Sequence, residues 1–221
     1  MGTRTLLRVQ LRMSDEEGPG LRVAVVTNAT AARQPSMHGY GAMVISELGS
    51  SGYKMTELRS VSAVANIAKG PLKKVGLNID RFLLSPISML GGAGDITHVI
   101  DPGNAIYLPL TRSRAKIITV HDLIPYLALA GELEGFRPST SGRLLMRGII
   151  RQLRKADALV AVSSKTRDDL IRIAGISSSK IKVNHTAMFH RMSSPTHRST
   201  LDENRHRHNI PKNAHIVMHI G

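Results

Sequence analysis

The chain has 221 residues, of which 42% are hydrophobic, and a chain of this length and composition buries a core in one large domain. It contains no cysteine, which excludes disulfides, thiolate metal sites and cysteine nucleophiles. The formal net charge of +14 at pH 7 favours an anionic partner such as nucleic acid, an acidic membrane surface or a phosphorylated substrate, although basicity without any specific partner is the simpler alternative.

Three absences narrow the class of protein further. Tryptophan is absent and aromatic residues make up only 3%, so a stacking platform for single-stranded nucleic acid is not expected, and nucleic acid is an unlikely partner. No apolar run reaches 18 residues, so no transmembrane helix is expected. Residues 1–20 lack the apolar segment and cleavage site of a signal peptide, which predicts a flexible extension and leaves the cytoplasm as the expected compartment.

The first elements after this extension predict a βαβ unit. Residues 21–27 form a nearly continuous apolar run, which is typical of a buried strand. A loop of small and polar residues over 29–41 and a helix over 42–48 follow. A second strand over 54–61 completes the unit, for which we expect the right-handed connection of parallel strands.

Strands and helices continue to alternate through the middle of the chain. The predicted elements are a helix over 78–90 that Pro86 interrupts, strands over 95–100, 116–120, 159–162 and 180–183, and helices over 142–155 and 165–174. This alternation predicts an α/β fold, with a doubly wound, mostly parallel Rossmann-like sheet and helices on both faces.

The composition changes near residue 190. The segment 191–214 is rich in polar and basic residues and is predicted to be a linker or an exposed connection. A new apolar run begins at His215, so residues 215–221 are predicted to form the first strand of a second domain. The sequence thus predicts one Rossmann-like domain over 21–190. A flexible extension is predicted to precede it, and a linker and the first strand of a second domain are predicted to follow it.

Two polar residues at the end of the strand over 116–120 are the first candidates for a functional site. Ligands bind at the carboxyl ends of strands in open α/β sheets, and His121 and Asp122 lie there. A neutral imidazole can hold a substrate hydroxyl or a leaving-group oxygen, whereas the structural alternative for His121 is a hydrogen bond to a backbone carbonyl. Asp122 either orients the histidine or caps the next turn, and we favour the cap.

Ser163 and a pair of glycines are the remaining candidates. Ser163 ends the strand over 159–162 and precedes a helix, as a helix N-cap does. Gly39 and Gly41 precede the first predicted helix, where backbone N–H groups can approach an anion; a tight turn without a ligand is the alternative. The histidines show no paired ligand spacing, so no metal site is expected, and the lack of a G-x-G-x-x-G motif argues against a dinucleotide cofactor.

Three segments together resemble the acceptor-side half of glycosyltransferases with the GT-B fold, family 4 type. They are Thr-Val-His-Asp-Leu-Ile-Pro over 119–125, Ala-Asp-Ala-Leu-Val-Ala-Val-Ser over 156–163 and Lys-Ile-Lys-Val-Asn-His over 180–185. Their order and spacing match the family, and the resemblance extends over about residues 21–190 and the final predicted strand.

This resemblance implies transfer of a sugar from a nucleotide-diphosphate-sugar donor to a sugar or lipid-linked acceptor, without a cofactor. It implies that His121 lies near the transferred sugar, Gly39 and Gly41 near the donor diphosphate, and Ser163 toward the cleft. In this family a C-terminal domain holds the donor, so the chain is expected to be inactive alone, with that domain missing or supplied in trans. The alternative is a non-catalytic Rossmann-like module that binds an anionic ligand or a partner protein.

The helix over 142–155 carries the clearest amphipathic pattern, with arginines largely opposite its apolar face. Its basic side is suited to an anionic membrane surface, which would make the protein peripheral at the inner membrane face. Its apolar face, however, is what any helix that covers a sheet requires, and packing on the sheet is the favoured interpretation.

Overall fold

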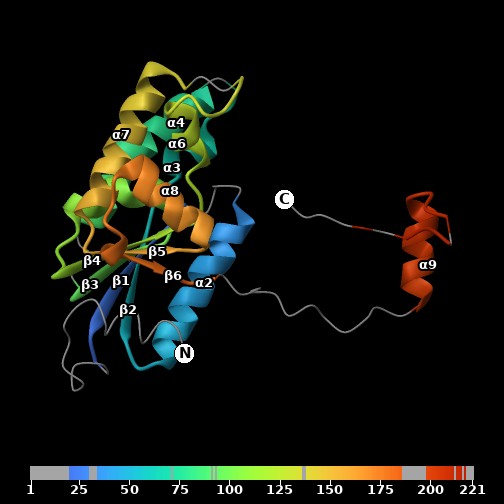
Figure 1. Cartoon of the computed structure of the whole chain (residues 1–221), viewed down its shortest axis with the longest axis horizontal. Helices are drawn as coiled ribbons and strands as arrows, with labels where there is room; N and C mark the ends of the chain where they lie inside the picture. Colours follow the sequence, from blue (N-terminus) through green and yellow to red (C-terminus); the bar gives the residue numbers. More distant parts are fainter. Residues whose placement is uncertain are drawn as a thin grey trace. The chain divides into compact units, whose positions relative to one another are not determined.

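The computed structural model describes residues 20–29, 34–70, 72–90, 92, 94–135, 138–185, 198–211, 213–215 and 217. Six parallel strands form one sheet in the order β2-β1-β3-β4-β5-β6 (Figure 1). They are β1 (Arg22–Thr27), β2 (Lys54–Arg59), β3 (Ile96–Val99), β4 (Ala115–Val120), β5 (Ala158–Ala161) and β6 (Ile181–Val183). The chain divides into two compact units, Met1–Ala187 and Met188–Gly221, and the sheet belongs to the first.

Helices connect the strands. They are α2 (Pro35–Ser50) after β1; α3 (Ala63–Ile67), α4 (Leu72–Ile79), the π-helical turn η2 (Asp80–Leu84) and α5 (Ser85–Met89) after β2; the 3₁₀ helix η3 (Pro102–Leu110) after β3; α6 (Ile124–Leu129) and α7 (Thr140–Lys155) after β4; and α8 (Ser164–Ala174) and the 3₁₀ turn η4 (Ser178–Lys180) after β5. Within the described residues, none of these helices is both long and apolar enough to cross a membrane.

Helices lie on both faces of the sheet. Alternate residues of a strand point to opposite faces, and Val26, Ile118 and Leu159 join the main core with side chains of η3, α7 and α8. Thr119 therefore points to the other face, where its Oγ1 lies 3.3 Å from the hydroxyl of Tyr40 in α2. This arrangement confirms the predicted doubly wound parallel fold.

The six strands predicted between residues 21 and 183 are all present, each within two residues of its predicted bounds. The packing interpretation of the amphipathic helix is also confirmed, because α7 buries Ile149 and Leu153 in the main core while Arg143 and Arg147 stay exposed. A nearly continuous apolar run was a sufficient signal for β1, and a one-sided apolar pattern was sufficient for α7.

Two helix starts differ from the prediction. Helix α2 begins at Pro35 rather than at residue 42, because the fixed φ of proline favours the first helical position. The predicted helix over 78–90 begins earlier, at Leu72, and continues past Pro86 with η2 directly before α5. Proline lacks the N–H that closes a helical turn, and a π-helical turn accommodates such a local defect.

The second unit contains a helix where the sequence predicted a linker. Helix α9 (Arg198–Arg207) is followed by Asn209 in the left-handed conformation, with φ of 53°, which is typical of a helix C-terminus. The sequence analysis did not predict this helix because it has no one-sided apolar pattern. Of the strand predicted over 215–221, only His215 and Val217 are described, and neither lies in a strand; residues 1–19 of the predicted extension also lie outside the described residues.

Candidate functional site

The carboxyl ends of three neighbouring strands meet at one edge of the sheet. The strand β2 follows β1 in the chain and lies on one side of it, and β3 follows β2 and lies on the other side of β1. The direction of the connections therefore changes between β1 and β3. In open α/β sheets this change marks the crevice where ligands bind. Asn28 follows β1, Asp101 follows β3 after Ile100, and His121 follows β4.

Two clefts open at this edge. The first, here called the switch cleft, has a volume of about 220 Å³ and is lined by residues that include Asn28, Ser60, Asp80 and Asn104. The second, here called the histidine cleft, has a volume of about 470 Å³. Its lining includes Met37, His121, Asp122, Tyr126 and Met146. Gln34, Asp101 and Gly103 line both clefts, so the two are adjacent.

A hydrogen-bonded amide and carboxylate network lines the switch cleft. The side-chain amide of the buried Asn28 donates to Asp101 Oδ2 at 2.6 Å and to Gln34 Oε1 at 2.5 Å. Asn28 Oδ1 accepts from Asn104 Nδ2 at 2.6 Å, and Asp101 Oδ1 accepts from the backbone N–H of Gly103 at 2.7 Å. The network fixes polar groups of β1, α2 and η3 around one cavity.

Asp101 is the residue that joins this network to the backbone. We expect Asp101→Ala to lower the free energy of unfolding by about 1–2 kcal/mol, because it removes one of the two acceptors of the Asn28 amide and the acceptor of the Gly103 N–H. Asp122→Ala is the matched control, since that exposed carboxylate caps a turn through a hydrogen bond from the Ile124 N–H. Urea unfolding measures both; a smaller loss for Asp101 than for Asp122 contradicts the prediction.

His121 combines a structural contact with a position in the histidine cleft. Its Nε2 lies 3.0 Å from the carbonyl oxygen of Ile100, and a carbonyl only accepts, so in the neutral form of the ring the proton is on Nε2. That tautomer leaves the Nδ1 lone pair as an acceptor. The ring also meets Tyr40 edge-on, with centroids 4.8 Å apart and planes at 90°. The backbone contact that the sequence analysis gave as the structural alternative for His121 is therefore present, and the substrate role stays a prediction.

A second histidine lies behind His121, within the sheet. His98 is buried, and its Nε2 lies 2.8 Å from Thr119 Oγ1, which also contacts Tyr40. Burial, and to a smaller extent the charge of His121, lowers the pKa of His98 to about 4. His98 is thus neutral near pH 7, and it supports the wall of the site through Thr119 and Tyr40.

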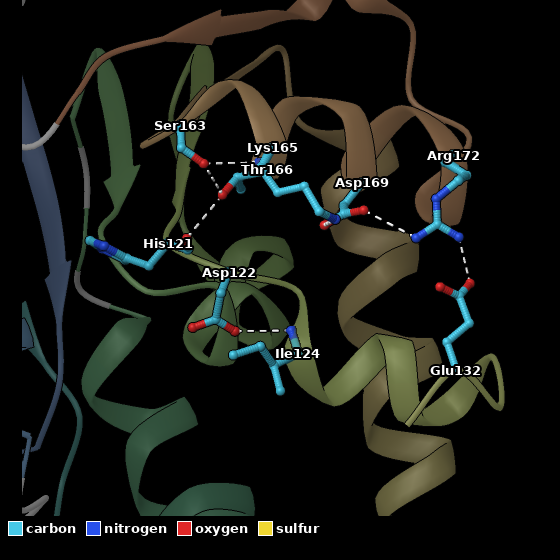
Figure 2. A network of polar contacts seen from close by, with 9 residues as sticks. All are labelled: His121, Asp122, Ile124, Glu132, Ser163, Lys165, Thr166, Asp169 and Arg172. Atoms are coloured by element: carbon cyan, nitrogen blue, oxygen red, sulfur yellow. Dashed lines mark hydrogen bonds and ion pairs between the residues drawn. The ribbon is translucent and has the colours of Figure 1, made fainter. Parts of the chain in front are cut away.

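Asp122 makes the capping contact that the sequence favoured. Its Oδ1 accepts from the backbone N–H of Ile124 at 3.0 Å and so caps the turn into α6 (Figure 2). The carboxylate is exposed and is part of the lining of the histidine cleft.

Ser163 is the N-cap of α8, as predicted. Its Oγ accepts from the backbone N–H of Thr166 at 3.0 Å and lies 2.9 Å from the Thr166 hydroxyl, which donates to the carbonyl of His121 at 3.1 Å (Figure 2). Ser163 is not in the lining of either of these two clefts. Its contacts fix the backbone at the end of β4, on which the imidazole of His121 depends.

An ion-pair chain continues from this point along α8. Asp169 accepts from Lys165 Nζ at 2.5 Å and from Arg172 at 3.1 Å, and Arg172 reaches Glu132 at 2.5 Å (Figure 2). The hydrogen bond from Lys165 is the main reason that the pKa of Asp169 is lowered. Since Glu132 lies in the loop after α6, these ion pairs connect that loop to α8.

The placement of the two glycines corrects the sequence analysis. Gly39 and Gly41 lie inside α2, where backbone N–H groups donate to carbonyls four residues earlier, and not in a loop before it. A Cβ atom on Gly41 would lie 2.8 Å from Ile100 Cδ1, so this glycine lets the helix approach the sheet closely. The loop geometry that would bring free N–H groups to a diphosphate is therefore absent at these two positions.

Several residues of the site were missed by sequence reasoning. Asn28 and Asp101 follow strands, as His121 does, and the same rule would have identified them. Asn104 and Tyr40 carried no such signal. Among the residues that the structure describes, no group of three or more His, Cys, Asp or Glu side chains is arranged to hold a metal ion.

These strands and clefts define a parallel α/β domain with two adjacent clefts at the carboxyl edge of its sheet. Over residues 88–188, the chain matches the family model described as Glycosyltransferase Family 4. The matched segment contains β3 to β6 with His121, Asp122 and Ser163, whereas β1, α2 and the two glycines lie outside it. No curated protein matches the chain.

Proposed function

We propose that this chain is the acceptor-side part of a glycosyltransferase that moves a sugar from a nucleotide-diphosphate-sugar donor to an acceptor. The observation that carries the proposal is the position of His121. It lines the histidine cleft at the carboxyl end of β4, within the segment that matches the family 4 model. The family match suggests the activity, and the cleft supplies space for a sugar ring.

His121 is proposed to hold the sugar that is transferred. Its Nε2 is engaged by the carbonyl of Ile100, so Nδ1 is the atom available to accept a hydrogen bond from a sugar hydroxyl. Asp122 is proposed to accept a second hydroxyl with the carboxylate oxygen that does not cap the turn. Ser163 keeps a positioning role through Thr166.

The switch cleft is proposed to receive the acceptor. Amide, carboxylate and hydroxyl groups from Asn28, Asp101, Asn104 and Ser60 line it, and such groups recognise hydroxylated molecules through paired donors and acceptors. The Asn28 network holds these groups in place before a ligand arrives. Less of the recognition energy is then lost to ordering side chains.

The donor is proposed to be held by a second α/β domain, as the family resemblance implies. That domain is either encoded with this chain or supplied as a separate chain. The alternative function, a non-catalytic module for an anionic ligand or a partner protein, rests on the net charge of +14.

The test is a transfer assay on the purified chain with nucleotide sugars and candidate acceptors. We expect no turnover above blank, because a site shared between two domains is completed only by their closure. Addition of a donor-binding domain should restore transfer. Robust transfer by the chain alone overturns the half-enzyme proposal, and ligand binding that never leads to transfer supports the non-catalytic alternative.

A further inference from the structure

We propose that the outer face of residues 72–90 is a docking surface for an anionic lipid bilayer. Apart from Leu77, which is 50% exposed and lines the switch cleft, six large apolar side chains of this helical segment are exposed to solvent, with exposed fractions from 52% to 65%. They are Leu72, Val75, Phe82, Leu83, Ile87 and Leu90, and we call them the apolar stripe. Large apolar surfaces that remain exposed are typical of protein or membrane interaction sites.

The spacing of these residues places them on one side of the segment. Intervals of three, seven, one, four and three residues follow the helical period. The opposite side is buried, and it consists of Gly76, Asp80, Ser85 and Met89. The interval of five residues between Asp80 and Ser85 spans the π-helical turn η2, which keeps the buried side in line.

Small and polar side chains hold the segment in this orientation. A Cβ atom on Gly76 would lie 3.0 Å from the backbone nitrogen of Ala65 in α3, so the two helices touch at this glycine. The carboxylate of Asp80 accepts from the N–H groups of Val64 and Ala65 at 3.0 and 2.8 Å, and Ser85 Oγ accepts from the Val61 N–H at 2.9 Å. These contacts direct the apolar stripe outward.

The charges around the apolar stripe identify an anionic bilayer as the occupant. Asp80 is the single acidic residue between positions 58 and 94, and its carboxylate is buried. The side chains of Lys73 and Arg81 are exposed on the same segment, and that of Lys69 is exposed just before it. Apolar side chains beside basic ones bind acidic lipid surfaces, whereas a second copy of this chain would bring like charges together.

The same segment forms part of the switch cleft. Asp80, Arg81 and Ser85 line that cleft, so docking through the apolar stripe would hold the cleft beside the lipid head groups. The docking surface itself does not depend on sugar transfer. A lipid-linked acceptor in the switch cleft is a corollary that rests on the proposed function.

Vesicle binding by the full chain is the test. The chain should bind vesicles of phosphatidylcholine with phosphatidylglycerol and ignore vesicles of phosphatidylcholine alone. The double variant Leu83→Ser with Ile87→Ser should bind at least about tenfold more weakly, because both side chains lose their apolar contact with lipid. Leu144→Ser is the matched control, since this α7 side chain is 72% exposed and lies outside the apolar stripe.

A spectroscopic variant tests contact with lipid directly. The chain has no tryptophan, so Phe82→Trp introduces one emitter within the apolar stripe, and Leu144→Trp places the same emitter on α7. Acidic vesicles should shift the emission of the first variant to the blue and leave the second unchanged. Unchanged circular dichroism in every variant shows that the fold is intact.

Three results would overturn the assignment. The first is that the parent chain fails to bind acidic vesicles. The second is that the Leu83 and Ile87 double variant, folded as the parent is, binds them equally well. The third is a dimer in analytical ultracentrifugation that the double variant abolishes, because the apolar stripe would then be covered by a second copy.

Discussion

Replacing His121 by alanine is expected to lower sugar transfer by about 10²-fold or more once the donor-binding domain is present, the usual scale for a positioned hydrogen-bonding or acid–base group. The imidazole lines the histidine cleft, and its removal takes away the Nδ1 acceptor proposed for the sugar. Turnover with saturating donor and acceptor measures the effect. Because the contact is proposed to matter in the transition state, the fall should be in kcat more than in KM.

The control must separate catalysis from folding. His185 follows β6 and is exposed, so His185→Ala removes a histidine near a strand end that lies outside both clefts. It should leave transfer unchanged. Near-normal turnover of His121→Ala, with its thermal unfolding also unchanged, would leave this histidine with the structural contact to Ile100 as its role.

The second large effect is on stability and comes from His98. Its pKa is lowered to about 4 in the folded chain, from the ordinary value of 6.5. Well above pH 6.5 the His98 ring is neutral in both the folded and the unfolded chain, so its burial does not reduce the free energy of unfolding. As the pH falls below 6.5, the unfolded chain takes up a proton that the folded chain excludes, and the free energy of unfolding drops by about 2 kcal/mol between pH 7 and pH 5.

Urea unfolding at pH 7, 6 and 5 checks this dependence. His98→Gln keeps an amide that can bond to Thr119 but does not titrate, so its stability should change less over the same range. His185→Gln is the matched control, because an exposed histidine is not desolvated on folding. A parent and a His98→Gln variant with the same pH dependence would show that burial of His98 does not control it.

The sequence determined those features whose signals are local. The strands β1, β4 and β5 are largely apolar runs followed by polar residues, and each strand lies where its run predicts. The cap at Ser163 and the left-handed Gly175 that ends α8 follow from neighbouring residues alone. The position of His121 at a strand end was predictable for the same reason, and so was the resemblance carried by these segments.

The composition of the site was decided by the tertiary structure. Asn28 and Asp101 are 73 positions apart in sequence, and they meet because β1 and β3 are neighbours in the sheet. His98, Thr119 and Tyr40 come together because α2 crosses one face of that sheet. No local pattern reports such contacts, because strand order is fixed by the packing of the whole domain.

The helical segment over 72–90 shows the same division most clearly. Its periodicity defines an apolar side, and on that basis alone the apolar side would be placed in the core. In the folded chain the buried side is instead the one with Gly76 and Asp80, because a close backbone approach and a carboxylate bonded to two N–H groups attach it to α3. Sequence thus determined that an apolar stripe exists, and tertiary contacts decided that it faces outward.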